Sequence, residues 1–291
     1  IVLNKTSFYA ESGGQVGDSG SIQNKDFSLN VLDTQKSGDS IIHICDLEKG
    51  SLSEEFNVNC KIDDLRREDI KSNHSATHLL HQALKDILGS HISQAGSLVG
   101  PNYLRFDFTH PNKLAKNDME AIDLLVNDKI AENIPVTTEI KTLEEAKKEG
   151  ATALFGEKYG EKVRVLTMGS FSKELCGGTH VSSTGEISKF MITQDKAIAA
   201  GVRRVHAITG QYVDSYIQSA MDATNRLKEA SQKKELEKKS QSDLLNAIDL
   251  DTIIENQQQL DNIPFINEEV VLESADGLKK LNKKLNKKFK S

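Results

Sequence analysis

The sequence predicts an α+β protein that begins with a small β-barrel, continues as a larger α+β domain and ends in a helical tail. Glycine marks the boundary before the helical tail, because 18 of the 19 glycines lie at or before Gly210 and only Gly277 follows. Glycine favours turns and weakens helices, so turn-rich structure should give way to helix near that point. The predicted parts are residues 1–67, 68–210, 211–261 and 262–291, the last being the start of a further domain.

Short runs of alternating apolar and polar residues fill the first sixty positions. Residues 27–32 (Phe-Ser-Leu-Asn-Val-Leu) and 41–44 (Ile-Ile-His-Ile) are separated by Ser-Gly and Gly-Asp turn signals. This pattern is typical of short antiparallel strands joined by tight turns. We therefore predict a small antiparallel barrel or sheet for the first part.

The middle region predicts two helices with strands around them. Residues 72–88 carry an apolar face, with Ser72 or Asn73 as the N-cap and Gly89 placed to end the helix. Residues 117–133 show the same helical spacing. Strands are expected at residues 136–140, 163–168 and 187–193.

The tail predicts a charged helix after Gly210 and a basic amphipathic helix at residues 278–289. Leucines at 278, 281 and 285 and the phenylalanine at 289 share one side of this last helix. Its lysines could contact RNA. An apolar stripe that packs against other parts of a longer protein is at least as good an interpretation.

The bulk composition excludes some classes of protein. No apolar run approaches the roughly 20 residues that a membrane-spanning helix needs, so a membrane protein is excluded. Three cysteines give no even framework of disulfides, which favours a reducing cytoplasm. The formal charge of −6 argues against a generally basic nucleic-acid binder, although a local basic patch could hold a phosphate backbone. The opening Ile-Val-Leu-Asn-Lys lacks an initiator methionine, so we expect a piece of a longer protein.

Four residues have the spacing of metal ligands. His74 and His78 are four positions apart on a predicted helix, so both imidazoles project from one face. Cys176 and His180 frame a Cys-Gly-Gly-Thr-His segment that offers a thiolate and a third imidazole. Mixed nitrogen and sulfur donors favour zinc over magnesium or calcium. The sequence therefore predicts one Zn²⁺ bound by these four side chains.

Two neighbouring observations limit this prediction. His81 lies one turn further along the helix and is too distant for the metal, so we assign it a supporting or structural role. A metalloprotease needs a glutamate between the paired histidines, where this chain has Ser75, Ala76 and Thr77. That class is excluded.

Residues 73–81 (Asn-His-Ser-Ala-Thr-His-Leu-Leu-His) and 176–180 closely resemble the editing domain of alanyl-tRNA synthetases and of their stand-alone editing relatives. Residues 6–18 (Thr-Ser-Phe-Tyr-Ala-Glu-Ser-Gly-Gly-Gln-Val-Gly-Asp) resemble the glycine-rich motif of that family. Further similar segments follow in the same order at 94–99, 104–108 and 201–210. The resemblance covers about residues 1–210. The helical stretch after it is similar to a synthetase linker and the start of its C-terminal domain.

This resemblance implies a zinc-dependent deacylase that hydrolyses tRNA(Ala) wrongly carrying serine or glycine. A pocket that activates alanine discriminates against these amino acids by only about 1–3 kcal/mol, so a second site must correct the errors. The absence of recognisable ATP-binding aminoacylation motifs predicts that this segment neither activates alanine nor uses ATP. Partner contacts through the rest of a C-terminal domain would allow oligomerisation.

The resemblance also suggests individual roles. Thr6 and Gln94 are candidates to hydrogen-bond the serine hydroxyl, although without the resemblance they would be an ordinary strand and loop residue. Gly13 and Gly14 could let backbone amides approach the terminal adenosine or the ester, and a tight turn explains them equally well. Three arginines are candidates for phosphate contacts or for ordinary surface ion pairs: Arg105, Arg203 and Arg204.

Four protein ligands complete a structural zinc site, whereas a catalytic zinc usually keeps one position open. We therefore expect Cys176 or His180 to bind loosely or to yield when substrate arrives, and we assign Cys176 a catalytic role. The main rival is a non-catalytic tRNA-binding module with a structural zinc. A zinc hydrolase of small esters or amides is a more distant rival.

Overall fold

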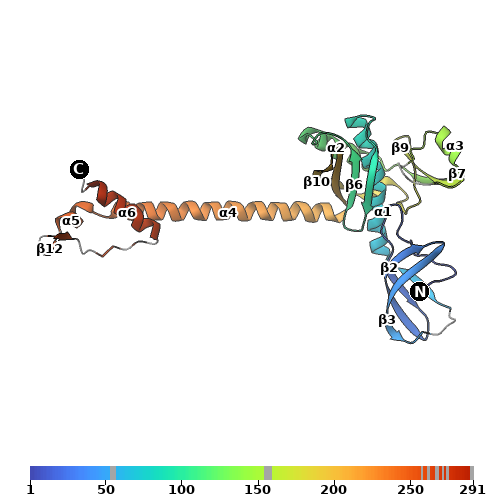
Figure 1. The fold of residues 1–291 in the computed structure, drawn as a ribbon, viewed down its shortest axis with the longest axis horizontal. Coiled ribbons are helices and arrows are strands. Elements are labelled where there is room, and N and C mark those ends of the chain that lie inside the picture. The colour runs from blue at the N-terminus through green and yellow to red at the C-terminus, as the bar shows by residue number, and fades with distance from the viewer. Residues whose placement is uncertain are drawn as a thin grey trace. The chain divides into compact units, whose positions relative to one another are not determined.

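The structure is a computed structural model that describes residues 1–291 except 53–56, 154–158, 257, 261–262, 266–268, 271, 273–274 and 289–291. The chain packs as two compact units, Ile1–Tyr216 and Ile217–Ser291. The first unit contains three antiparallel sheets and the long helix α1, and Figure 1 shows α1 connecting the N-terminal sheet to the other two. The α+β class is confirmed.

The N-terminal sheet has four antiparallel strands in the order β3-β2-β1-β4. They are β1 (Gly20–Gln23), β2 (Phe27–Ser37), β3 (Ser40–Gly50) and β4 (Asn59–Ile62). Alternate residues of β2, namely Phe27, Leu29 and Val31, are buried with Phe8 and Ile22 in a small core. The alternation of apolar and polar residues in the sequence therefore indicates a sheet with one face covered by this core. The strand pairings do not confirm closure into the predicted barrel.

Helix α1 (Asp64–Leu88) starts eight residues before the predicted first residue. The N-cap is Asp63, whose side chain accepts a hydrogen bond from the Arg66 backbone amide, so the prediction of Ser72 or Asn73 as N-cap is wrong. Asn73 instead lies inside the helix, where its buried side-chain amide donates to the carbonyl oxygens of Gly100 and Pro101, each at 2.9 Å. Asparagine is a common helix cap, but the side chain of Asn73 instead makes a tertiary contact from inside the helix.

The second sheet carries the main hydrophobic core. Its order is β10-β11-β6-β5, built from β5 (Gln94–Val99), β6 (Leu104–Thr109), β10 (Phe190–Ala199) and β11 (Val202–Thr209). Buried residues of α1 and of α2 (Lys116–Ala131) pack against it. The strand predicted at 187–193 starts later, because Thr184–Ile187 form a 3-10 turn and Ser188 has φ of 69°. A positive φ at a non-glycine residue ends that turn and re-aims the chain.

The third sheet, β7-β8-β9, leads into the Cys-Gly-Gly-Thr-His loop (residues 176–180). It consists of β7 (Val136–Thr142), β8 (Lys162–Met168) and β9 (Ser172–Leu175). The short helix α3 (Leu143–Lys148) follows β7 and has a complete capping box formed by Thr142 and Glu145. Cys176 comes directly after β9, so the register of β8 and β9 sets where the thiol lies.

Helix α4 (Gln211–Ala247) confirms the predicted charged helix and continues into the second unit. The second unit also holds α5 (Leu250–Glu255), a hairpin of β12 (Gln258–Leu260) and β13 (Ile263–Phe265), and α6 (Ala275–Lys288). The predicted terminal helix is therefore confirmed as α6, where Leu281 is buried, while Phe289 of the predicted stripe lies outside the described residues. None of the described helices combines the length and apolar character needed to cross a membrane.

Replacement of a core residue in α2 should destabilise the first unit. Ile122 is completely buried, so Ile122→Ala is expected to lower the free energy of unfolding by about 2–5 kcal/mol. Leu124 on the same helix is 64% exposed, so Leu124→Ala should change it by less than about 0.5 kcal/mol. Urea denaturation followed by circular dichroism measures both, and equal effects would contradict this assignment of the core.

Candidate metal centre

Helix α1 places two imidazoles side by side on its buried face. His74 and His78 are one turn apart, and their rings stack with centroids 5.3 Å apart. Both side chains are buried. The i, i+4 spacing in the sequence therefore produces the predicted pair.

The Cys-Gly-Gly-Thr-His loop brings the other two donors to this pair. Cys176 Sγ lies 3.4 Å from His74 Nε2 and 3.2 Å from His180 Nε2. One donor atom from each of the four residues lies within 4.8 Å of the others. Around a tetrahedral ion with bonds of about 2.0–2.3 Å, donor atoms lie roughly 3.3–3.7 Å apart. His74, His78, Cys176 and His180, here called the metal cluster, could thus hold one metal ion.

Each histidine of the metal cluster has a partner at Nδ1. His74 Nδ1 donates to Gln15 Oε1 at 2.7 Å, and His78 Nδ1 donates to Glu174 Oε2 at 2.7 Å. His180 Nδ1 lies 3.2 Å from Ser75 Oγ. These partners leave the Nε2 atoms for a ligand, and His78 Nε2 is buried without a hydrogen-bond partner among the described residues. A partner on the far nitrogen is the usual arrangement for metal-bound histidine, because it fixes the ring and the tautomer.

The electrostatics of the metal cluster favour a thiolate. Burial alone raises the pKa of the Cys176 thiol, but neighbouring His74 and His78 and the hydrogen bond with His180 hold that pKa well below its ordinary value. The pKa of His180 is lowered to about 3, first by burial and second by the charge of His74. A thiolate beside the neutral His180 imidazole suits metal binding. Burial lowers the pKa of His78, but Cys176 and Glu174 outweigh burial and raise that pKa to about 10, so His78 has to lose a proton before a metal binds there.

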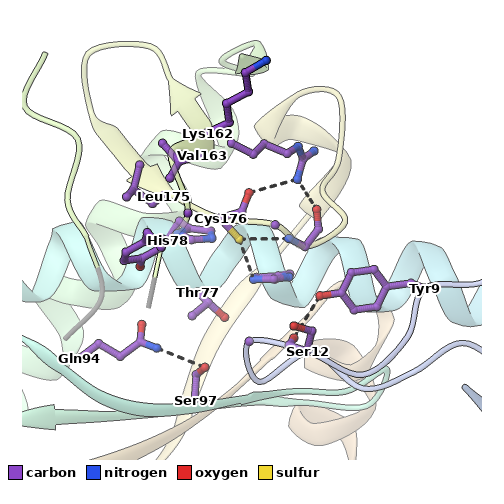
Figure 2. Close-up of a pocket in the computed structure, with 17 residues that line it drawn as sticks. Tyr9, Ser12, Thr77, His78, Gln94, Ser97, Lys162, Val163, Leu175 and Cys176 are labelled. Carbon is purple, nitrogen blue, oxygen red and sulfur yellow. Dashed lines mark hydrogen bonds between the residues drawn. The ribbon is translucent and has the colours of Figure 1, made fainter. Parts of the chain in front are cut away.

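The metal cluster opens into a cavity of about 440 Å³. Figure 2 shows Gln94 and Ser97 on one side of it, and Thr77 and His78 on α1. Tyr9 and Ser12 of the glycine-rich motif and Lys162 of β8 also line it. Arg164 also lines it and donates from Nη1 to the carbonyl oxygens of Cys176 at 3.3 Å and Gly178 at 2.5 Å. Polar and apolar groups thus line the cavity together, and three residues of the metal cluster, His74, His78 and Cys176, form part of its wall.

The structure brings some of the predicted site residues to this cavity. Gln94 and Gly13 line it, and Gln94 Nε2 donates to Ser97 Oγ at 3.3 Å. Gly14 packs against Ser97, where an added Cβ would lie 2.4 Å from the hydroxyl oxygen. Among the described residues Thr6 does not line the cavity, because its hydroxyl contacts His43 Nε2 at 2.7 Å.

The three predicted arginines are held by carboxylates. Arg203 is 6% exposed and forms a bidentate pair with Asp195, with both distances 2.7 Å. Arg204 pairs in the same way with Asp107, and Arg105 Nε lies 3.7 Å from Asp107. These contacts correspond to the ion pairs considered from the sequence, and a role in phosphate binding stays a prediction.

Two residues next to the metal cluster were not predicted from the sequence. Glu174 is 2% exposed and also accepts from His81 Nδ1 at 2.8 Å, so His81 shares a carboxylate with the cluster. Gln15 reaches His74 across 59 residues of sequence. The signal for Glu174 in the sequence was its position two residues before Cys176, since side chains two positions apart in an extended segment point to the same side. Within the glycine-rich motif, roles were predicted for Gly13 and Gly14 only, so Gln15 was missed.

Comparison with known proteins adds to this geometry. Residues 1–66 match the family model of class II (A) tRNA synthetases, and residues 163–206 match that of the threonyl and alanyl tRNA synthetase second additional domain. An alanine–tRNA ligase of Haemophilus influenzae strain 86-028NP is 47% identical over 260 residues, which is 89% of this chain and 28% of the relative. The chain belongs to the alanyl-tRNA synthetase family.

A second alanyl-tRNA synthetase relative, from Haemophilus influenzae strain ATCC 51907 / DSM 11121 / KW20 / Rd, is 54% identical over 211 residues. That match covers 72% of this chain and 24% of the relative. The chain therefore spans about a quarter of the length of these alanine–tRNA ligases. The second additional domain of the alanyl-tRNA synthetase family includes Cys176 and His180, half of the metal cluster.

The two glycines of the Cys-Gly-Gly-Thr-His loop should differ sharply in their tolerance of a side chain. A Cβ at Gly178 would lie 2.1 Å from His74 Cε1, whereas a Cβ at Gly177 would meet nothing within 4 Å. Gly178→Ala should displace the imidazole or the loop and lower metal affinity by at least about 10-fold, the range seen when ligand orientation is disturbed.

Gly177→Ala is the matched control and should retain the parent's affinity. Metal content per chain after dialysis against a competing chelator measures the difference, and circular dichroism reports whether both variants are folded. Equal metal retention by the two variants would show that the close approach of Gly178 to His74 is not needed.

Proposed function

We propose that this alanyl-tRNA synthetase segment corrects errors of aminoacylation by zinc-dependent hydrolysis of Ser-tRNA(Ala) and Gly-tRNA(Ala). Water supplies the attacking oxygen, the ester bond between the acyl carbon and the ribose oxygen breaks, and the ribose oxygen leaves with a proton. The products are free amino acid and uncharged tRNA. The observation that carries the proposal is the metal cluster, three residues of which line a cavity that also has polar side chains in its wall.

The donor set fits zinc. One thiolate and three imidazoles are borderline to soft donors, which suit zinc better than magnesium or calcium. When bound there, zinc would act as a Lewis acid that polarises the ester or lowers the pKa of water. His74 and His78 would hold it from α1, and His180 from the loop. Cys176 would contribute the negative charge, and one of the two loop ligands would yield to substrate.

The cavity offers polar groups that could select serine. The Gln94 amide and the hydroxyls of Ser97 and Thr77 lie on its walls. Alanine would leave such a group without its partner, at a cost of about 1–3 kcal/mol. Thr6 keeps its proposed role only if its contact with His43 opens. Gly13 lies where backbone could approach the ester or the terminal adenosine.

Positive charge at the cavity suits the nucleic-acid end of the substrate. Lys162 and Arg164 both line it, and tRNA phosphates bind cationic side chains. Arg164 is occupied by two loop carbonyls, so its first role is to hold the loop. Arg105, Arg203 and Arg204 remain candidates for more distant phosphates. The family assignment supports tRNA as the partner, and the proposed compartment is the cytoplasm.

A tRNA-binding module with a structural zinc is the alternative. The observation in its favour is that four protein donors already complete a tetrahedral shell. The two functions differ in one outcome, which is whether serine is released.

Removal of the thiolate should abolish editing. Cys176→Ala is expected to slow release of serine from Ser-tRNA(Ala) by at least roughly 100-fold, because loss of a ligand should exceed the about 10–100-fold effect of its hydrogen-bond partners. Chelation of the metal should have the same effect, and added zinc should reverse it. The measurement is release of labelled serine at low enzyme concentration.

Cys60→Ala on β4 is the matched control, since this cysteine lies outside the residues that line the cavity. It should retain the parent's rate. Near-normal hydrolysis by Cys176→Ala would overturn the proposed mechanism. Binding of mischarged tRNA without release of serine, by a folded and metal-loaded parent chain, would instead establish the structural alternative.

A further inference from the structure

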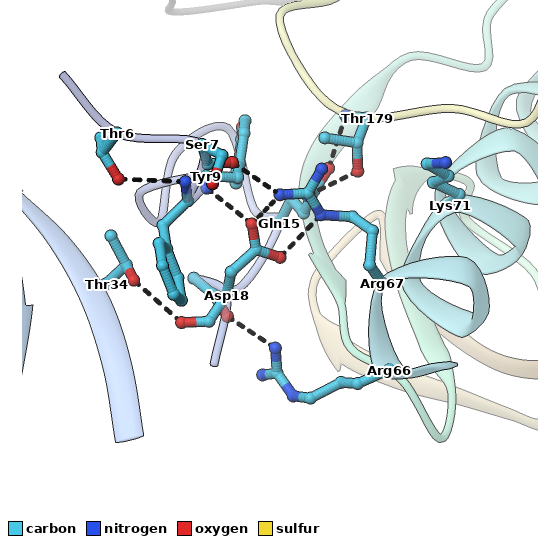
Figure 3. Close-up of polar contacts among 12 residues, drawn as sticks. Thr6, Ser7, Tyr9, Gln15, Asp18, Thr34, Arg66, Arg67, Lys71 and Thr179 are labelled. Carbon is cyan, nitrogen blue, oxygen red and sulfur yellow. Dashed lines mark hydrogen bonds and ion pairs between the residues drawn. The ribbon is translucent and has the colours of Figure 1, made fainter. Parts of the chain in front are cut away.

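One buried amide connects the N-terminal sheet region to both halves of the metal cluster. Gln15 has no exposed surface, and its side chain makes three hydrogen bonds. Its Oε1 accepts from His74 Nδ1 at 2.7 Å and from the Thr179 backbone amide at 2.9 Å. Its Nε2 donates to Thr179 Oγ1 at 2.9 Å. Figure 3 shows Gln15 reaching Thr179 beside the Asp18 contacts.

The backbone around Gln15 is fixed on both sides. Val16 N donates to the Val99 carbonyl at 3.1 Å, and Val99 N donates to the Gly14 carbonyl at 2.7 Å. These bonds attach the glycine-rich motif to β5. Gln15 therefore presents its amide from a held segment, as a pre-organised ligand support requires.

Asp18 attaches the same motif to the first turns of α1. Its carboxylate forms an ion pair with Arg67, whose Nε donates to Oδ1 at 2.8 Å, and both side chains are largely buried. The Arg66 guanidinium donates to the Gly17 carbonyl at 2.8 Å (Figure 3). The helix that carries His74 and His78 is thus fastened to the motif that carries Gln15.

We infer that Gln15 is a positioning residue of the metal centre, which clasps His74 and the Cys-Gly-Gly-Thr-His loop together so that His74 Nε2 and the loop donors converge. This inference rests on the proposed metal-dependent function. The glycine-rich motif would then have two roles. Its backbone would approach the substrate, and its Gln15 side chain would support the metal site.

An amide suits this position better than the other polar groups. Its oxygen accepts from two N–H groups while its nitrogen donates to a hydroxyl, so one side chain satisfies all three contacts. A neutral acceptor also adds no second negative charge beside the Cys176 thiolate, whereas the His78 side of the cluster already has Glu174. The fit is tight, since a Cβ at Gly178 would lie 2.8 Å from Gln15 Oε1.

The experiment uses cobalt(II) as the probe, because its visible spectrum reports ligand geometry. Gln15→Met keeps the volume and removes the three hydrogen bonds. We expect altered ligand-field bands and about 10–100-fold faster loss of cobalt to a chelator. Gln82→Met on α1 is the matched control, since Gln82 contacts only Asp86 among the described hydrogen-bond partners, and it should behave as the parent chain does.

The variant Gln15→Glu distinguishes a role of Gln15 in orienting His74 from a role in holding the fold together. Its carboxylate can still accept from both N–H groups, so cobalt retention should return towards that of the parent, while the stronger acceptor on His74 should shift the bands. A parent-like spectrum and loss rate for folded Gln15→Met would overturn the inference. If Gln15→Met does not fold, the cobalt spectrum of Gln15→Glu becomes the test. Ligand-field bands identical to those of the parent chain would then overturn the inference. Failure of the parent chain itself to bind cobalt or zinc would refute the proposed metal-dependent function instead.

Discussion

The geometry of the metal cluster depends on a contact at Nδ1 of each imidazole, which leaves Nε2 for a metal ion. An imidazole can rotate and can carry its proton on either nitrogen, so an unsupported ring would present the wrong atom part of the time. Gln15, Glu174 and Ser75 remove that freedom for three rings, and they come from three separate parts of the chain. The packing that builds the core around α1 therefore also brings these supports to the metal cluster.

The sequence predicted the ligands of the candidate metal centre but not their supports. His74 and His78 were predictable because helical geometry alone relates positions i and i+4. Cys176 and His180 were added because the Cys-Gly-Gly-Thr-His segment offers a thiolate and a third imidazole across a Gly-Gly turn. Gln15 and Glu174 were missed because their contacts with the histidines span 59 and 96 residues, and no local pattern specifies such distances.

The fold was predictable to a similar degree. Periodicity located α1, α2 and the strands β2, β3, β7, β8 and β10, because burial of one face leaves a regular trace in the sequence. It misplaced the start of α1, since Ser72 and Asn73 have the composition of a cap while Asp63 provides the observed one. The predicted barrel rested on strand pattern alone, and that pattern does not distinguish a closed from an open sheet because it specifies no pairing between the first and last strands.

The separation of the two halves of the metal cluster along the chain has a consequence for biosynthesis. Cys176 lies 102 residues after His74. At a translation rate of about 5–20 residues per second, the paired histidines leave the ribosome roughly 5–20 s before the thiol. Gln15 and Asp18 are made earlier still, so the nascent chain has a partner for His74 and an anchor for α1 throughout that interval. The order of synthesis lets the helix side of the centre assemble before the loop arrives.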